Sequence, residues 1–194
     1  MEATAAPARD PSRSLEGCRR IIVIGTTGSG KTTLATQLAG HLAVPRIELD
    51  ALHWGPNWTP NPVEVFRAQV AAATAPERWV LDGNYSAVRD IVWPRADTLI
   101  WLDYPLAVNL WRLVRRGFVR SARRVRLYGN NLETFRGNFF SRDSLVLWAI
   151  KSHGRKRGEY PTLLALPEHA HLAAIRIRSP QETRRWLARV GGGQ

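Results

Sequence analysis

Eight consecutive residues near the start of the chain have the types and the spacing that bind phosphate groups. The pattern G-x-x-x-x-G-K-[ST] is met by Gly25-Thr26-Thr27-Gly28-Ser29-Gly30-Lys31-Thr32. Glycines let backbone N–H groups approach an anion closely, and a helix that follows favours negative charge at its N-terminus. Lys31 can reach the β- and γ-phosphates of a nucleoside triphosphate, and the Thr32 hydroxyl can bind Mg²⁺. The segment predicts a nucleotide-binding loop that extends to Thr33.

The residues on either side of this loop favour the same interpretation. The apolar, β-branched run from Ile21 to Ile24 is typical of a buried parallel strand. After the loop, Leu34, Leu38 and Leu42 recur every four residues, which favours one face of a helix. Strand, glycine-rich loop and helix follow one another in the order that such a loop requires.

Three further predicted strands end in aspartate, at Asp50, Asp82 and Asp103. Ligands of open α/β sheets bind at the carboxyl ends of the strands, so these carboxylates are expected beside the loop. Asp82 precedes a glycine and is predicted to hold Mg²⁺ with Thr32, the alternative being a simple Asp-Gly turn. Asp50 is a candidate to orient an acceptor hydroxyl or to act as its general base, the alternative being a helix cap or loop carboxylate. Asp103 is expected to cap the next helix.

The segment from Tyr104 to Leu132 contains many arginines and no acidic residue. A continuous helix would place on one face Arg112, Arg116, Arg120 and Arg124, which are spaced by four. Such cations neutralise the charge that develops on a phosphoryl group during transfer, and we predict this role for Arg112 and Arg116. A solvated basic face and a nucleic-acid footprint are the alternatives, as they are for the second basic run, Lys151 to Arg157.

The elements that must position these residues alternate between strand and helix. Strands are predicted over residues 20–25, 45–50, 79–82, 98–103 and 171–177. Helices are predicted over 31–42, 61–73, 86–93, 143–152, 163–166 and 180–190, with another that begins at 105 and a loop over 52–62. This alternation predicts an α/β layer fold with a mostly parallel sheet.

Composition narrows the possible classes of protein. The net charge is +12 at pH 7, and all but three of the basic residues are arginine, which suits recognition of an anionic acceptor. The single cysteine, Cys18, fits a reducing compartment, and no segment resembles a signal peptide or a membrane span. We therefore expect a cytoplasmic protein that does not enter a membrane. Residues 1–18 are predicted to form a disordered extension, 19–190 one folded domain, and about 115–143 a lid.

The combination of motifs resembles the adenylate-kinase-like group of small P-loop kinases. It is most similar to the branch named topology modulation protein, or FlaR-like, over about residues 20–190. Besides the loop, the resemblance rests on Leu49-Asp50-Ala51-Leu52-His53-Trp54, Trp79-Val80-Leu81-Asp82-Gly83-Asn84-Tyr85, Arg95-Ala96-Asp97-Thr98, Trp101-Leu102-Asp103-Tyr104-Pro105 and Arg178-Ser179-Pro180.

The resemblance implies a three-layer sandwich around a five-stranded parallel sheet, with a mobile, arginine-rich helical lid. It implies ATP as donor and Mg²⁺ as metal, with Asp82 supporting the metal and Arg112 and Arg116 clamping phosphates. Arg142 would bind phosphate at the end of the lid, and Arg178 would lie at the adenine loop. Asp50 is placed like the substrate-binding aspartate of shikimate-kinase-like enzymes. The other residues expected near the acceptor are His53, Trp54, Tyr85 and Arg89.

The leading hypothesis is thus an ATP-dependent phosphotransferase that acts on a nucleotide or a small molecule, and the arginine content allows an anionic acceptor. Two alternatives stay open: a nucleic-acid-associated P-loop NTPase and a nucleotide-gated binding module. Nucleic acid is the less favoured partner because the arginines cluster where a kinase lid belongs.

Overall fold

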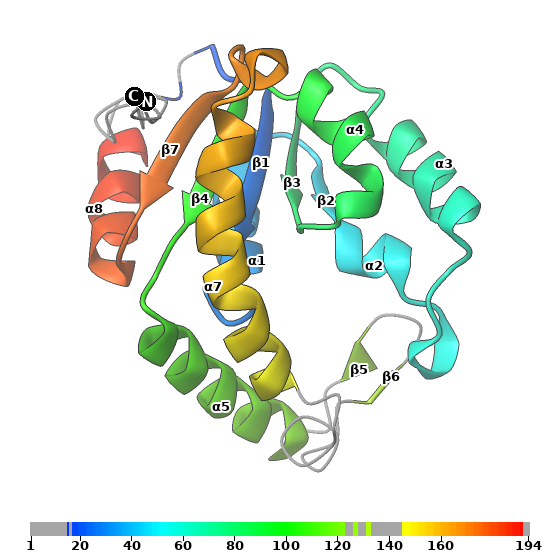
Figure 1. Ribbon diagram of the computed structural model, residues 1–194, viewed down its shortest axis with the longest axis vertical. Helices are drawn as coiled ribbons and strands as arrows, with labels where there is room; N and C mark the ends of the chain where they lie inside the picture. The colour runs from blue at the N-terminus through cyan, green and yellow to red at the C-terminus, as the bar shows by residue number, and fades with distance from the viewer. Residues whose placement is uncertain (1–14, 16, 123–125, 128–130, 133–144, 192–194) are drawn as a thin grey trace.

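The computed structural model describes residues 15, 17–122, 126–127, 131–132 and 145–191. Five parallel strands form the central sheet in the order β2-β3-β1-β4-β7 (Figure 1). Their bounds are β1 (Arg20–Gly25), β2 (Arg46–Glu48), β3 (Trp79–Asp82), β4 (Thr98–Leu102) and β7 (Ala173–Ile177). The predicted five-stranded parallel sheet is confirmed.

Helices connect the strands and flank the sheet. The α-helices are α1 (Lys31–Leu42), α2 (Leu49–His53), α3 (Val63–Ala73), α4 (Arg89–Val92), α5 (Leu106–Ala122), α7 (Leu145–Leu164) and α8 (Pro180–Gly191). Short 3₁₀ helices are η1 (Pro56–Trp58), η2 (Ser86–Val88), η3 (Trp93–Arg95) and η5 (Pro167–His169). A separate antiparallel pair joins β5 (Arg126–Leu127) to β6 (Asn131–Leu132).

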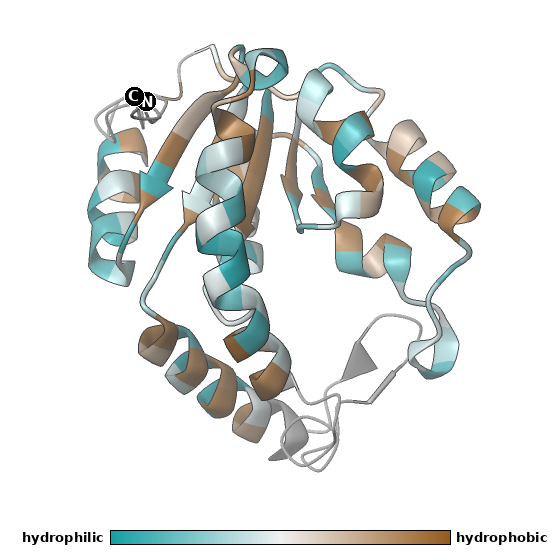
Figure 2. Cartoon of the chain, viewed as in Figure 1, coloured by the Kyte–Doolittle hydropathy of each residue, from teal (hydrophilic) through white to brown (hydrophobic). Residues whose placement is uncertain are grey.

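Two apolar clusters, one on each face of the sheet, form the core. Ile22 and Ile24 of β1 pack with apolar residues of α2, α3, α4 and α7. The alternating residues Ile21 and Val23 pack with α1 and α8. Strand β1 is apolar along most of its length because both of its faces are covered (Figure 2). The result is the predicted three-layer sandwich.

One predicted strand ends earlier than expected and gives way to a helix. The strand predicted over 45–50 is β2, which ends at Glu48, and Asp50 lies in the first turn of α2. The loop predicted over 52–62 therefore begins with helical residues and also contains η1. Burial of Leu49, which is 2% exposed, anchors the start of α2 to the core. This contact with the core is not visible in the local sequence.

The largest departure concerns the helix that follows the predicted lid. The helices predicted over 143–152 and 163–166 overlap a single helix, α7, which contains Gly154, Gly158 and Pro161. Glycine and proline have the lowest helix propensities, so the local sequence predicts a break. Packing overrides propensity here because Tyr160 is buried against the ring of Trp101, at 5.3 Å between centroids. In Figure 1, α7 crosses in front of the sheet and reaches α5 beyond the strand ends.

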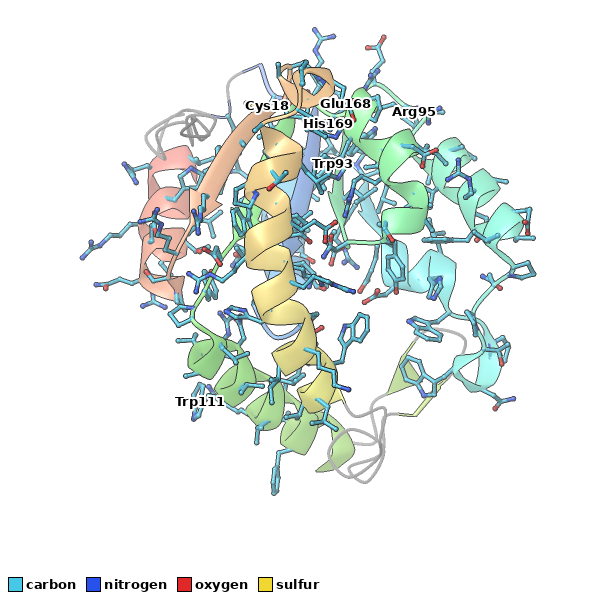
Figure 3. All side chains as sticks on the ribbon, viewed as in Figure 1. Cys18, Trp93, Arg95, Trp111, Glu168 and His169 are labelled. Carbon is cyan, nitrogen blue, oxygen red and sulfur yellow. The ribbon has the colours of Figure 1, made fainter. Side chains whose placement is uncertain are left out.

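Two further observations concern the periphery. Leu15, which lies in the predicted disordered extension, is 5% exposed and packs in the cluster that contains α1 and α8. Residues 1–14 lie outside the described residues, so the extension stays a prediction there. Trp111 of α5 is 63% exposed and points away from α7 (Figure 3). Within the described residues, no helix is long and apolar enough to cross a membrane.

Candidate active site

The phosphate-binding loop joins β1 to α1 and leaves the start of that helix open. Gly30 is the N-cap of α1, and within the described residues no side chain caps the helix or places a carboxylate in its first turn. The hydroxyl of Ser29 is buried and lacks a hydrogen-bond partner in the described part of the chain. The Lys31 ammonium is 3.3 Å from the Thr26 carbonyl oxygen. The open helix N-terminus, the unpartnered Ser29 hydroxyl and the nearby ammonium of Lys31 suit the phosphates of a nucleotide.

Close packing against α5 explains one glycine of the loop. Gly28 has a φ of +86°, and a Cβ atom at this position would lie 2.4 Å from the carbonyl oxygen of Asn109 in α5. Any larger residue would therefore push α5 away from the loop. The helix in turn brings Arg112 to the loop, where one guanidinium nitrogen donates to the Ser29 carbonyl oxygen at 3.3 Å.

Asp82 ends β3 beside the loop, as predicted for a metal-supporting carboxylate. Its side chain is nearly inaccessible, and the Thr32 hydroxyl lies close enough to act on the pKa of this carboxylate and lower it. The Arg46 guanidinium lies 3.2 Å from one of its oxygens and also pairs with Glu48 at 2.7 Å. Burial raises the pKa of Asp82 in spite of these partners. A hydroxyl next to a carboxylate is an oxygen pair that suits Mg²⁺, so the residues fit the predicted metal.

The Lys31 ammonium faces the carboxylates of both Asp82 and Asp50. Burial is the largest influence on this group and lowers its pKa, while Asp50 and Asp82 raise it and Arg116 lowers it. Arg116, the second predicted lid arginine, thus also acts on the charge of Lys31. The structure therefore brings to one place the loop lysine, the two candidate carboxylates and the two arginines of α5.

Asp50 sits at the edge of an aromatic cluster that consists of His53, Trp54, Trp58, Phe66 and Tyr85. The Tyr85 hydroxyl donates a 2.7 Å hydrogen bond to the Asp50 carboxylate. His53 contacts three rings of the cluster, and Trp54 packs edge-on to Trp58 at 5.9 Å between centroids. Burial lowers the pKa of His53, and Asp50 opposes that shift. The predicted acceptor residues His53, Trp54 and Tyr85 thus surround Asp50.

Three other predicted residues lie apart from this group. Arg89, which is expected near the acceptor, pairs with Glu159 of α7 at 2.7 Å and lies over the ring of Trp93. Arg178 is exposed directly after β7, and its role at the adenine loop stays a prediction. Arg142 lies outside the described residues, and its role at the end of the lid stays a prediction.

Helix α7 supplies site residues that the sequence did not reveal. His153 is buried, and its Nδ1 lies 3.2 Å from the Thr26 hydroxyl in the loop. Burial lowers the pKa of His153, as does Arg157. Lys156 faces Lys31 and Asp50, and burial is the main reason that its pKa falls to about 8. These residues belong to the basic run Lys151 to Arg157, for which the sequence predicts a solvated face or a nucleic-acid footprint.

The carboxylate of Asp103 is buried and holds two arginines. Arg157 of α7 lies 2.8 Å from one oxygen, and Arg176 of β7 donates to the other at 2.9 Å. The expectation that Asp103 caps the next helix is therefore wrong. Its side chain connects α7 to the sheet, because Arg157 of α7 and Arg176 of β7 both pair with this one buried carboxylate. Helical spacing was the available signal for α7: His153, Arg157 and Tyr160 share one face.

Comparisons with solved structures support the fold. A gluconokinase from Sinorhizobium meliloti 1021 matches with a TM-score of 0.50 and 19% identity, over 93% of this chain and 96% of its own. A shikimate kinase from Bacteroides thetaiotaomicron matches with a TM-score of 0.53 and 17% identity, over 91% of this chain and 98% of its own. A shikimate kinase from Acinetobacter baumannii, in complex with shikimate, matches with a TM-score of 0.55 and 16% identity, over 93% of this chain and 94% of its own.

These likenesses show that the chain has the fold of small P-loop kinases over nearly its whole length. No protein-family model matches the chain, and no curated protein sequence matches it.

Proposed function

We propose that this protein is an ATP- and Mg²⁺-dependent kinase that phosphorylates a hydroxyl group of a small molecule. One observation carries the proposal: the loop lysine, Lys31, faces both the candidate metal carboxylate Asp82 and the candidate base Asp50. Donor phosphate, metal and acceptor hydroxyl can therefore meet at a single ammonium group. The solved kinases of the same fold are consistent with this reading.

On the donor side, the open N-terminus of α1 and Lys31 would hold the β- and γ-phosphates of ATP. Thr32 and Asp82 would hold Mg²⁺, whose charge offsets that of the phosphates when it is bound. Arg112 and Arg116 of α5 would neutralise charge on the group in transfer, since both lie at the loop. Arg178 would line the adenine end of the nucleotide.

On the acceptor side, Asp50 would receive the proton of the attacking hydroxyl. The hydroxyl oxygen forms a bond to the γ-phosphorus, the bond from that phosphorus to the bridging oxygen breaks, and ADP leaves. The Tyr85 hydrogen bond fixes the orientation of the carboxylate. Exclusion of water by a closed lid would protect ATP from hydrolysis.

We also propose, on the motifs around Asp50 and Asp82, that the chain belongs to the topology modulation protein, or FlaR-like, branch. The aromatic cluster around His53 suggests a role for the Leu-Asp-Ala-Leu-His-Trp motif, whose His53 packs against Trp54 and against Tyr85. It builds one wall of the acceptor site with rings instead of with arginines.

The kinase proposal is tested by removing the ammonium at the centre of the site. Lys31→Met should reduce phosphoryl transfer from labelled ATP by at least about 100-fold, because transition-state charge is then left uncompensated. Lys151→Met is the matched control, since it removes an exposed lysine of α7 and should leave transfer unchanged. Full activity in the Lys31 variant would reject the proposal.

A further inference from the structure

Lys156 occupies a defined position on a helix that is fixed on both sides. On the loop side, His153 contacts Thr26 and Arg157 binds Asp103. On the opposite side, Glu159 binds Arg89 of α4. Successive residues of an α-helix are about 100° apart, so Lys156 points between these two sets of contacts. From that position Lys156 is subject to the charges of Lys31 in the phosphate-binding loop and of Asp50 in α2.

The ammonium of Lys156 has no ion-pair partner among the residues that the structure describes, and it is not an exposed side chain. The like charges of Lys31 and Arg155 act against the charge of this ammonium. The nearby carboxylates are engaged: Asp50 by the Tyr85 hydroxyl and Glu159 by Arg89. A partly buried cation without a partner is unfavourable, so this arrangement favours a ligand that brings an anion.

The position of Lys156 distinguishes the acceptor from the donor. Lys31, Arg112 and Arg116 already surround the loop from α1 and α5. Lys156 comes instead from α7 and also faces Asp50, the candidate base for the acceptor. The rings of Trp54 and Tyr85 pack against His53, and Tyr85 also binds Asp50, so they offer an apolar face for a carbon skeleton beside that carboxylate.

We propose that Lys156 binds an acidic group of the acceptor, so that the substrate is a small hydroxylated carboxylic acid or sugar phosphate whose reacting hydroxyl lies at Asp50. This inference rests on the proposed kinase function and names the substrate class of the same site. Lys156 then selects anionic acceptors over neutral compounds of the same shape.

The test compares matched neutral and acidic acceptors with the full-length protein, labelled ATP and Mg²⁺. The probes are glycerol with glycerate and glycerol 3-phosphate, and glucose with gluconate and glucose 6-phosphate. Transfer to acids but not to their neutral counterparts is the expected result. Comparison of the carboxylates with the phosphates identifies which kind of acid the site takes. Equal use of the neutral compounds, or calorimetry that detects binding of none of the acids to protein saturated with a non-hydrolysable ATP analogue, would overturn the substrate class.

Variants then test Lys156 itself. Lys156→Met should raise the KM for the acid about 10- to 100-fold, because a charge-assisted hydrogen bond is lost, and should leave the Kd of ATP unchanged. Lys156→Arg should restore most of the affinity, and the exposed Lys151→Met should behave like the natural protein. Weaker ATP binding in Lys156→Met, with equal losses for every acceptor, would instead place the residue at the donor phosphates and overturn the proposal.

A pH profile separates binding from a merely structural role. The KM for the acid should rise as the pH increases through about 8, where the Lys156 ammonium loses its proton. The charged groups that face it are Lys31, Asp50, Arg155 and Glu159. Lys156→Arg should abolish this rise, since arginine stays charged. A rise that persists in the arginine variant would contradict the assignment. Absence of transfer to any compound together with absence of ADP formation would reject the kinase proposal itself.

Discussion

The Tyr85 hydroxyl donates a 2.7 Å hydrogen bond to the Asp50 carboxylate and so connects the segment after β3 to the short helix α2. Asp50→Asn should lower the turnover number about 100- to 10,000-fold, because the attacking hydroxyl loses its base. Tyr85→Phe should cost about 10-fold, since the carboxylate stays but is less well oriented. Phosphoryl transfer and ATP affinity are measured in parallel, and ATP affinity should not change. Asp90→Asn, an exposed control, should be neutral.

Asp82 is expected to show a conflict between metal binding and stability. Burial raises its pKa, so the folded protein holds the proton more tightly than the unfolded chain, and stability from this group grows as the pH falls. Asp82→Asn should therefore maintain or increase the unfolding free energy at neutral pH. It should also raise the Mg²⁺ concentration for half-maximal activity by at least about 10-fold. Urea unfolding and a Mg²⁺ titration measure the two effects, and an unaltered Mg²⁺ requirement would contradict the metal role.

The two ion pairs of Asp103, with Arg157 and Arg176, should contribute mainly to stability. Asp103→Ala leaves Arg157 and Arg176 without their buried anion and should cost about 2–4 kcal/mol of unfolding free energy in urea. Arg157→Met should cost less, because its side chain is 46% exposed and Asp103 retains Arg176. A loss of unfolding free energy below about 1 kcal/mol for Asp103→Ala would show that these ion pairs contribute little to stability.

His153 should make stability depend on pH below neutrality. Its folded-state pKa lies below the ordinary value of 6.5, mainly through burial, so the unfolded chain binds the extra proton more readily. The stabilisation is complete above 6.5 and is lost as the pH falls below that value. His153→Gln keeps a polar contact to Thr26 and should flatten this dependence. His53 and His169 shift in the same direction, so the difference between the two proteins is the relevant measurement. Parallel curves would contradict the assignment.

The donor half of the site could be predicted because its information is local. The glycine pattern, the flanking strand and helix, and the aspartate at the end of β3 are each contained in a few consecutive residues. Parallel strands then bring Asp82 to the loop, as the register of Val23 with Asp82 shows. No knowledge of distant contacts was needed for this step.

The α7 contribution could not be predicted because it depends on pairs far apart in the chain. Helical spacing shows that His153 and Arg157 share a face, but not that the face meets Thr26 and Asp103. The helix itself is also hard to predict because it contains Gly154, Gly158 and Pro161, which have low helix propensity, and tertiary packing maintains it. The same reason explains why Asp50, predicted at a strand end, lies in a helix.

Because lysine is scarce in this chain, lysines near the candidate site can be labelled selectively. The chain has three lysines; Lys31 and Lys156 face each other with lowered pKa, whereas Lys151 is exposed. Arginines stay protonated, but a lysine with a lowered pKa offers an uncharged amine to electrophiles near neutral pH. Under the proposed function, an acylating reagent or aldehyde attached to an acidic polyol would meet the Lys156 amine at the acceptor site. Covalent inhibitors and affinity labels can be anchored there without a cysteine.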